Sequence, residues 1–238
     1  MSAKDWFKIF EWRVDDDGVT ITKFLKADAT SVDVPSEIDG KPVVAIGNWV
    51  FSRCRSLTKV SLPEGLQTIG DCAFSHCSSL TKVSLPKGLQ TLGVMAFAYC
   101  SSLTEVSFSK GLQTIGNCAF SHCFSLTEVS FSKGLQTIGD CAFSRCSSLT
   151  KVSLPKGLQT LGVSAFSYCS SLTKITLPEG LQTIGDEAFL FCKLGNVAFP
   201  KGVKIGKNVL RRDELPPSSD PFYWAERGGV YADWGNPF

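Results

Sequence analysis

The stretch LTKVSLPEGLQTIGDCAFSHCSS, residues 57–79, recurs along most of the chain. Cysteine returns every 23 residues from Cys54 to Cys192, and phenylalanine keeps the same phase from Phe51 to Phe189. Self-similarity at one fixed period of this length indicates a solenoid or a repeat array, in which each unit packs on its neighbours. The repeat therefore sets the fold class of this 238-residue chain.

Each repeat has the pattern of one coil of a solenoid. Val60 and Leu62 alternate with polar residues, which predicts a short strand with one buried face. The Pro-Glu-Gly sequence that follows indicates a turn, and GLQTIG is a second extended segment. Ala73, Phe74 and Cys77 have the spacing of a single tight, 3₁₀-like turn with one buried side.

The repeats divide the chain into five parts, because a solenoid must cover the apolar cross-section at each end. All five tryptophans lie outside the regular repeats, as residues that cover an end would. The parts are an N-terminal β-hairpin cap (residues 1–31), a degenerate first repeat (32–56), six regular repeats (57–193), a degenerate last repeat (194–210), and an aromatic, Pro-rich C-terminal tail or cap (211–238).

The pattern LxxVxLPxGLxxIGxxAFxxCxxL resembles the 23-residue leucine-rich repeats of the BspA-like class, also called the Treponema type, over about residues 30–210. This resemblance implies a β-rich, right-handed solenoid arc with a parallel β-sheet of first strands on its concave face. The second extended segments and the tight turns would lie on the convex side. The resemblance also implies a bacterial protein that binds other proteins, among them host matrix and cell-surface proteins, as adhesins do.

Composition excludes several other classes. The chain has 24 Lys and Arg against 22 Asp and Glu, a net charge of +2, whereas a nucleic-acid partner calls for a strongly basic face. No apolar run approaches the roughly 18 residues of a membrane span, so we expect no membrane insertion. The N-terminus shows no signal peptide, which favours a cytoplasmic location unless a leader has been removed; the compartment otherwise stays open.

Motifs for catalysis and for cofactors are absent from the sequence. It contains no nucleophile elbow, Walker loop, dinucleotide fingerprint or HExxH, so we predict a non-catalytic protein without cofactors. DCAFSHC (71–77) and NCAFSHC (117–123) each hold two cysteines and a histidine. We predict no metal site there, because the second cysteine of each should face the core and the two stretches lie about 10 Å apart.

Ten cysteines raise the question of disulfides. Seven occupy one inward position in successive coils, where neighbouring side chains lie about 4.8 Å apart, beyond the Cβ spacing of about 3.5–4.5 Å that a disulfide needs. We therefore predict a row of buried thiols there. Cys72, Cys118 and Cys141 share a second position that is Glu187 in another copy, which places it near the surface. Their redox state stays open, with a Cys118–Cys141 bridge as one alternative.

The outward residues of the first strands form a charged row on the predicted concave face. An acidic centre is flanked by basic pairs, in the order Lys59, Lys82, Glu105, Glu128, Lys151 and Lys174. Ser107 and Ser130 accompany the two glutamates. Such patterns set the register and the association rate of a partner with complementary charge, so we predict that a partner protein binds here. The alternative is a solvated face that only keeps the protein soluble.

Two further surfaces are candidates. Cations and aromatics that can stack on one another alternate along the tight-turn edge: His76, Tyr99, His122, Phe124, Arg145 and Tyr168. The same residue types are enriched at protein interfaces, so this edge is an alternative binding surface. The tail is rich in aromatics: Phe222, Tyr223, Trp224, Tyr231, Trp234 and Phe238. The tail could cap its own solenoid or dock on a neighbour, and the alternative function is a self-assembling homo-oligomer organised by it.

Overall fold

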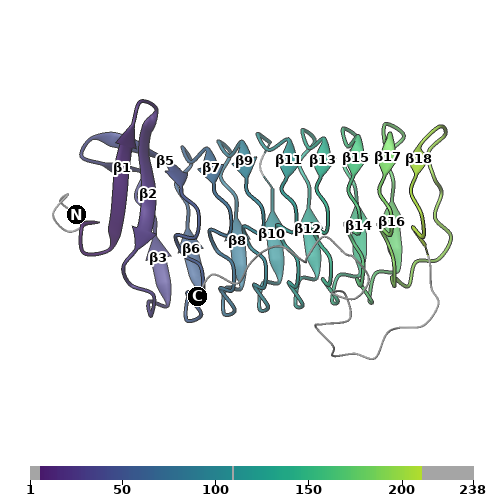
Figure 1. Ribbon diagram of the computed structural model, residues 1–238, viewed down its shortest axis with the longest axis horizontal. Helices are drawn as coiled ribbons and strands as arrows, with labels where there is room; N and C mark the ends of the chain where they lie inside the picture. The colour runs from purple at the N-terminus through teal and green to yellow at the C-terminus, as the bar shows by residue number, and fades with distance from the viewer. Residues whose placement is uncertain (1–5, 109, 211–238) are drawn as a thin grey trace.

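The computed structural model describes residues 6–108 and 110–210, which form a solenoid. In Figure 1 the coils follow one another along the long axis, from a β-hairpin at the N-terminal end to β18 (Lys204–Ile205) at the other. Every element between Phe10 and Ile205 is a strand. The predicted solenoid is confirmed, and each 23-residue repeat forms one coil.

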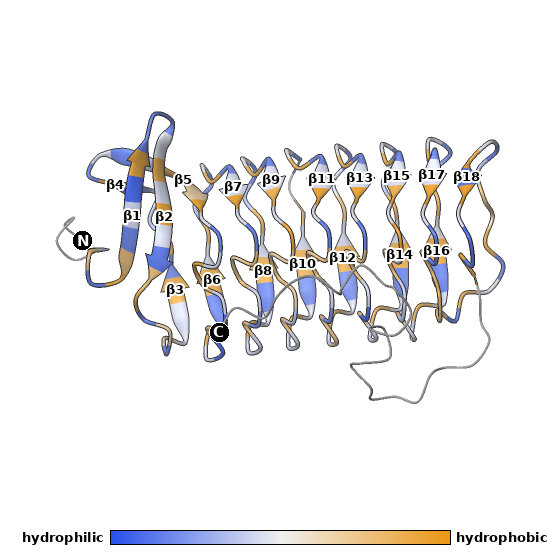
Figure 2. Cartoon of the chain, viewed as in Figure 1, coloured by the Kyte–Doolittle hydropathy of each residue, from blue (hydrophilic) through white to orange (hydrophobic). Residues whose placement is uncertain are grey.

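The first strand of each coil is three residues long, with its middle residue turned into the core. Val106 and Val129, for example, are buried cross-strand neighbours in a parallel register. Figure 2 shows the resulting bands of hydrophobic and hydrophilic residues within these strands. The first strands are β3 (Ser31–Asp33), β6 (Lys59–Ser61), β8 (Lys82–Ser84), β10 (Glu105–Ser107), β12 (Glu128–Ser130), β14 (Lys151–Ser153) and β16 (Lys174–Thr176). Five of them, β3 to β12, form one sheet, and β14 and β16 form another.

The second extended segment of each coil forms the longest sheet of the molecule. Its strands pair in parallel, with a buried residue such as Ile115 or Ile138 in each of them except β18, whose two residues are exposed. The strands are β5 (Lys41–Ile46), β7 (Thr68–Ile69), β9 (Thr91–Leu92), β11 (Thr114–Ile115), β13 (Thr137–Ile138), β15 (Thr160–Leu161), β17 (Thr183–Ile184) and β18. Together with the N-terminal strands they make an 11-stranded sheet. The solenoid thus has two faces formed by β-sheets along most of its length.

The tight turn closes each coil with alternating hydrogen bonds. The N–H groups of Cys72, Phe74 and His76 donate to carbonyls of the next coil at 2.7–2.9 Å. The N–H groups of Ala73, Ser75 and Cys77 each donate to the carbonyl three residues earlier, at 3.0–3.3 Å. These are the predicted 3₁₀-like bonds. However, Cys72 and His76 have φ values of 54° and 59°, so the chain leaves the right-handed region and no helix propagates.

The core is a column of stacked phenylalanine rings. Each ring between Phe51 and Phe189 lies 4.7–6.0 Å from the next, centroid to centroid. All seven of these side chains are fully buried. Phe108 and Phe131 add edge-to-face contacts to this column from the central first strands, at 5.5 and 5.7 Å. Phenylalanine therefore recurs with the repeat because each ring packs on its copies in the adjacent coils.

The N-terminal end is covered by the predicted β-hairpin. β1 (Phe10–Asp15) and β2 (Gly18–Phe24) pair antiparallel across a two-residue turn. β2 then pairs in parallel with β5, so the hairpin covers the end of the second-strand sheet. Before β5 the degenerate first repeat inserts β4 (Glu37–Ile38), which pairs antiparallel with β5.

Candidate protein-binding surfaces

The charged row lies on one face, here called the first-strand face. All six charged residues of the row are exposed, because outward positions alternate with the buried middle residue of each first strand. The parallel register places Lys82, Glu105 and Glu128 directly opposite one another on adjacent strands. Ser107 and Ser130 are exposed and form a second cross-strand pair beside the glutamates. The structure therefore places the predicted residues from Lys59 to Ser130 on one sheet, whereas Lys151 and Lys174 lie on the separate sheet of β14 and β16.

The first glutamate of the row is paired with its neighbour. The Nζ atom of Lys82 lies 3.0 Å from Oε2 of Glu105, and both side chains are largely exposed. Exposed pairs of this kind contribute roughly 0–1 kcal/mol, so this one orients the side chains more than it stabilises the fold.

Glu128 carries the uncompensated negative charge of the row. Its cross-strand neighbour on one side is Glu105, a like charge. On the other side the sheet is interrupted, because β12 and β14 are not paired, and the row changes there from Glu128 to Lys151. No described residue forms an ion pair with Glu128. The negative potential of the face is therefore concentrated at its centre, beside a break in the sheet.

The tight-turn edge is a column of rings that stack on each other. Tyr99 lies between His76 and His122, with ring centroids 4.5 and 4.3 Å apart and nearly parallel planes. Arg145 lies over the ring of Tyr168 at 4.8 Å. This confirms the predicted stacking of cations and aromatics, and it covers most ring faces within the column.

Two residues distinguish the centre of this edge. Phe124 stands where four of the other regular repeats have serine and the last has Lys193; it is 43% exposed and packs edge-on against His122 at 5.7 Å. Burial, together with the positive charge of Arg145, lowers the pKa of His122 to about 4. The Nδ1 atom of His122 lies 2.8 Å from the Ser121 hydroxyl. His122 is therefore a neutral ring at physiological pH.

The cysteines at the inward position form the predicted row of buried thiols. Six of them donate to the carbonyl of a phenylalanine in the preceding coil at 3.1–3.3 Å. Burial raises the pKa of Cys54 to about 12 and also raises those of Cys123 and Cys146, so these thiols are poor nucleophiles. None of the ten cysteines, all within the described ranges, is in a disulfide.

Of the three cysteines at the second position, one is more buried than the sequence predicted. Cys118 and Cys141 are half-buried, but Cys72 is buried. Burial, together with the nearby Asp71 carboxylate, raises the pKa of the Cys72 thiol to about 11. The prediction of a near-surface thiol is therefore wrong for Cys72.

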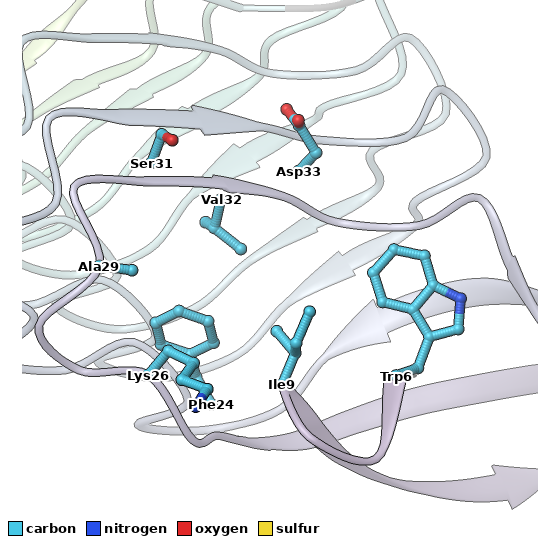
Figure 3. A pocket seen from close by; sticks show the side chains of 8 residues that line it. All are labelled: Trp6, Ile9, Phe24, Lys26, Ala29, Ser31, Val32 and Asp33. Atoms are coloured by element: carbon cyan, nitrogen blue, oxygen red, sulfur yellow. The ribbon is translucent and has the colours of Figure 1, made fainter. Parts of the chain in front are cut away.

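A pocket of about 500 Å³ lies beside β3, at the N-terminal end (Figure 3). Residues of the cap and of the first coil line it: Trp6, Ile9, Phe24, Lys26, Ala29, Ser31, Val32 and Asp33. This pocket could not be predicted from the sequence, since only the tertiary structure shows that the hairpin leaves space next to β3. In the sequence, only the apolar residues at the start of the cap indicate that a pocket could form there.

The tail residues from Phe222 to Phe238, predicted either to cap the solenoid or to dock on a neighbour, lie outside the described ranges. The described part of the chain contains no helix with the length and apolar character that a membrane crossing requires.

The comparisons with known proteins agree on the architecture. The family model for the BspA type leucine-rich repeat region matches residues 22–123 and 96–215, with six copies. The crystal structure of a leucine-rich repeat protein from Treponema pallidum is similar, with 32% sequence identity, a TM-score of 0.64 and 89% of each chain covered. No curated protein matches the chain.

Two longer proteins are also similar in structure. A leucine-rich cell surface protein from Faecalibacterium prausnitzii has 26% identity and a TM-score of 0.65, over 85% of this chain and 50% of that one. A leucine-rich repeat protein from Bacteroides ovatus has 26% identity and a TM-score of 0.66, over 83% of this chain and 60% of that one. This chain therefore spans about half to three fifths of these two relatives. The repeat pattern, the coil geometry and the family model together show that the chain belongs to the BspA-type leucine-rich repeat family.

Proposed function

We propose that this protein is a non-catalytic binding module that captures a partner protein on its first-strand face. One observation carries the proposal: Lys82, Glu105 and Glu128 stand in register on adjacent parallel strands. Backbone pairing fixes the strand spacing at about 4.8 Å, so the backbone that carries these charges needs no ordering on binding.

The charge pattern defines the partner. An acidic centre between Lys59 and Lys174 fits a surface with a basic centre and acidic flanks. Complementary patterns of this kind act mainly on encounter rate and register, so binding should weaken as salt rises. The exposed Ser107 and Ser130 hydroxyls supply neutral hydrogen-bonding groups next to the glutamates.

The relatives suggest where such a partner is found. One similar structure is a leucine-rich cell surface protein, and the family resemblance extends to proteins that bind host matrix. Matrix and cell-surface proteins are therefore the first partners to test. The tight-turn edge is the weaker candidate surface, because its rings already stack on one another.

The test is a charge swap in the full chain. Glu105→Lys with Glu128→Lys should reduce capture of matrix proteins, measured by bait pull-down with quantitative mass spectrometry, by tenfold or more. The matched control is Glu64→Lys with Glu179→Lys, which makes the same charge change at two exposed turns away from the row. Equal capture by the two double variants would contradict the proposed site.

A further inference from the structure

Among the described residues, the sheet of first strands ends at β3, and one side of this strand is unpaired. The Val34 N–H donates to the Ser61 carbonyl at 3.0 Å, and the Thr30 carbonyl accepts from the Thr58 N–H at 2.8 Å. Residues 30, 32 and 34 thus direct their backbone groups toward β6, and since successive residues alternate, Ser31 and Asp33 direct theirs to the opposite side. Among the described strands, β6 is the only one that pairs with β3. An edge of this kind is a template for one more strand.

The N-terminal hairpin pairs with the second-strand sheet and not with the first-strand sheet. β1 and β2 extend the second-strand sheet through the pairing of Val19 with Val43. No described strand extends the first-strand sheet beyond β3. In Figure 1 the hairpin accordingly continues the row of second strands, while β3 begins the row of first strands.

The pocket lies where the side chain of an added strand would point. Val32 is buried, and Figure 3 shows its side chain directed into the same space as those of Ile9 and Phe24. Cross-strand neighbours in a sheet point to the same face, so a residue placed opposite Val32 enters this pocket. A volume of about 500 Å³ accepts a large aromatic side chain. The site thus selects an extended peptide with one aromatic residue between two outward residues.

We propose that residues 229–234 of the same chain, which lie outside the described ranges, dock on β3 as this extra strand. In GVYADW, apolar Val230, Ala232 and Trp234 alternate with Tyr231 and Asp233, which is the period of a strand with one buried face. Trp234 then fills the pocket lined by Trp6 and Ile9.

The chain is long enough to make this return. From the end of the last coil to β3 the distance is roughly 35 Å, at about 4.8 Å for each coil. Residues 211–228 can span roughly 60 Å at about 3.3 Å per residue. Tethering raises the effective concentration of the segment to the millimolar range, so one strand and one aromatic side chain suffice for docking.

Hydrogen exchange of the full chain tests the proposal. The amides of Ser31 and Asp33 should exchange at least tenfold more slowly in the wild type than in Trp234→Ser, measured residue by residue by NMR. The Val34 amide, which is bonded to Ser61, serves as the internal reference and should not change. The matched control Trp224→Ser should leave both open-side amides protected. Equal exchange of these amides in the wild type and in Trp234→Ser would overturn the proposal.

A second variant tests the edge itself. Asp33→Pro removes an N–H on the open side and leaves the bonds to β6 in place, because proline is tolerated on the free side of an edge strand. In this variant the NMR chemical shift of the Trp234 indole should equal the shift measured in an isolated peptide of residues 222–238. An unchanged resonance would overturn strand addition. If the protection of the Ser31 and Asp33 amides rises with protein concentration, the docked segment belongs to a second copy of the chain. That result would overturn docking within one chain.

Discussion

The thiol of Cys123 donates a hydrogen bond to the main-chain carbonyl of Phe97 in the preceding coil, with sulfur and oxygen 3.3 Å apart. The same carbonyl also accepts the N–H of Cys100 at 3.3 Å. The thiol is therefore its second donor, and a weak one. We infer that this position stabilises the protein mainly by packing, since Cys123 is fully buried.

Truncation at this position tests that inference. Cys123→Ala should lower the free energy of unfolding by about 1–2 kcal/mol, because it opens a small cavity while the Phe97 carbonyl keeps its other donor. The measurement is the shift of the urea midpoint. Cys141→Ala, at the half-buried second position, is the matched control and should cost less than about 0.5 kcal/mol. Equal shifts for the two variants would show that the inward cysteines have no special packing role.

The glycine that ends each second strand is required by the closeness of adjacent coils. A Cβ atom on Gly162 would lie 2.6 Å from both the backbone nitrogen and Oδ1 of Asp140. Oδ1 of Asp140 in turn accepts the N–H of Val163 at 2.7 Å, so Asp140 cannot move without losing that bond. We predict that Gly162→Ala lowers the free energy of unfolding by about 1–3 kcal/mol.

The control for this substitution is Gly65, whose Cβ would meet nothing within 4 Å. Gly65→Ala should be neutral or slightly stabilising, by up to about 1 kcal/mol, because alanine restricts the unfolded chain. Both variants are compared by thermal unfolding. A Gly162→Ala protein as stable as Gly65→Ala would mean that the coils can separate locally at little cost.

The period of the sequence predicted the coil, the buried phenylalanine and cysteine positions, and the outward charged row. These features follow from a strict repeat, because a residue at one position meets its own copies in the adjacent coils. The charged row could be located in the same way, although the sequence did not show the interruption between β12 and β14. That interruption depends on how individual coils pair, which the repeat pattern does not report.

The left-handed residues of the tight turn could not be predicted. Positive φ usually indicates glycine or asparagine, yet Cys72, Met95 and Glu187 adopt φ values of 54–57°. Their N–H groups donate to carbonyls of the next coil, and these bonds offset the cost of about 1–2 kcal/mol for each residue. The cause is therefore a contact between coils, which residue type alone does not report. The open edge of β3 was missed for the same reason.

The histidine at the centre of the tight-turn edge makes the stability depend on pH. His122 stacks on Tyr99, and burial lowers its pKa to about 4 from an unfolded value of about 6.5. Between these two values the unfolded chain binds a proton that the folded protein does not, so the stability is complete above pH 6.5 and falls as the pH is lowered toward 4. We expect a loss of about 2–3 kcal/mol across this window from His122.

His122→Tyr isolates this effect, because tyrosine occupies the equivalent position in two other coils, at Tyr99 and Tyr168, with similar φ values. The variant should keep the ring column and lose most of the difference between urea midpoints at pH 7 and pH 4.5. His76→Tyr is the control, and it should remove less of that difference because the His76 ring is less buried. An NMR titration of the wild type adds a direct measurement. A His122 ring that titrates near pH 6.5 in the folded protein would contradict the prediction, since the stack would then tolerate the imidazolium form.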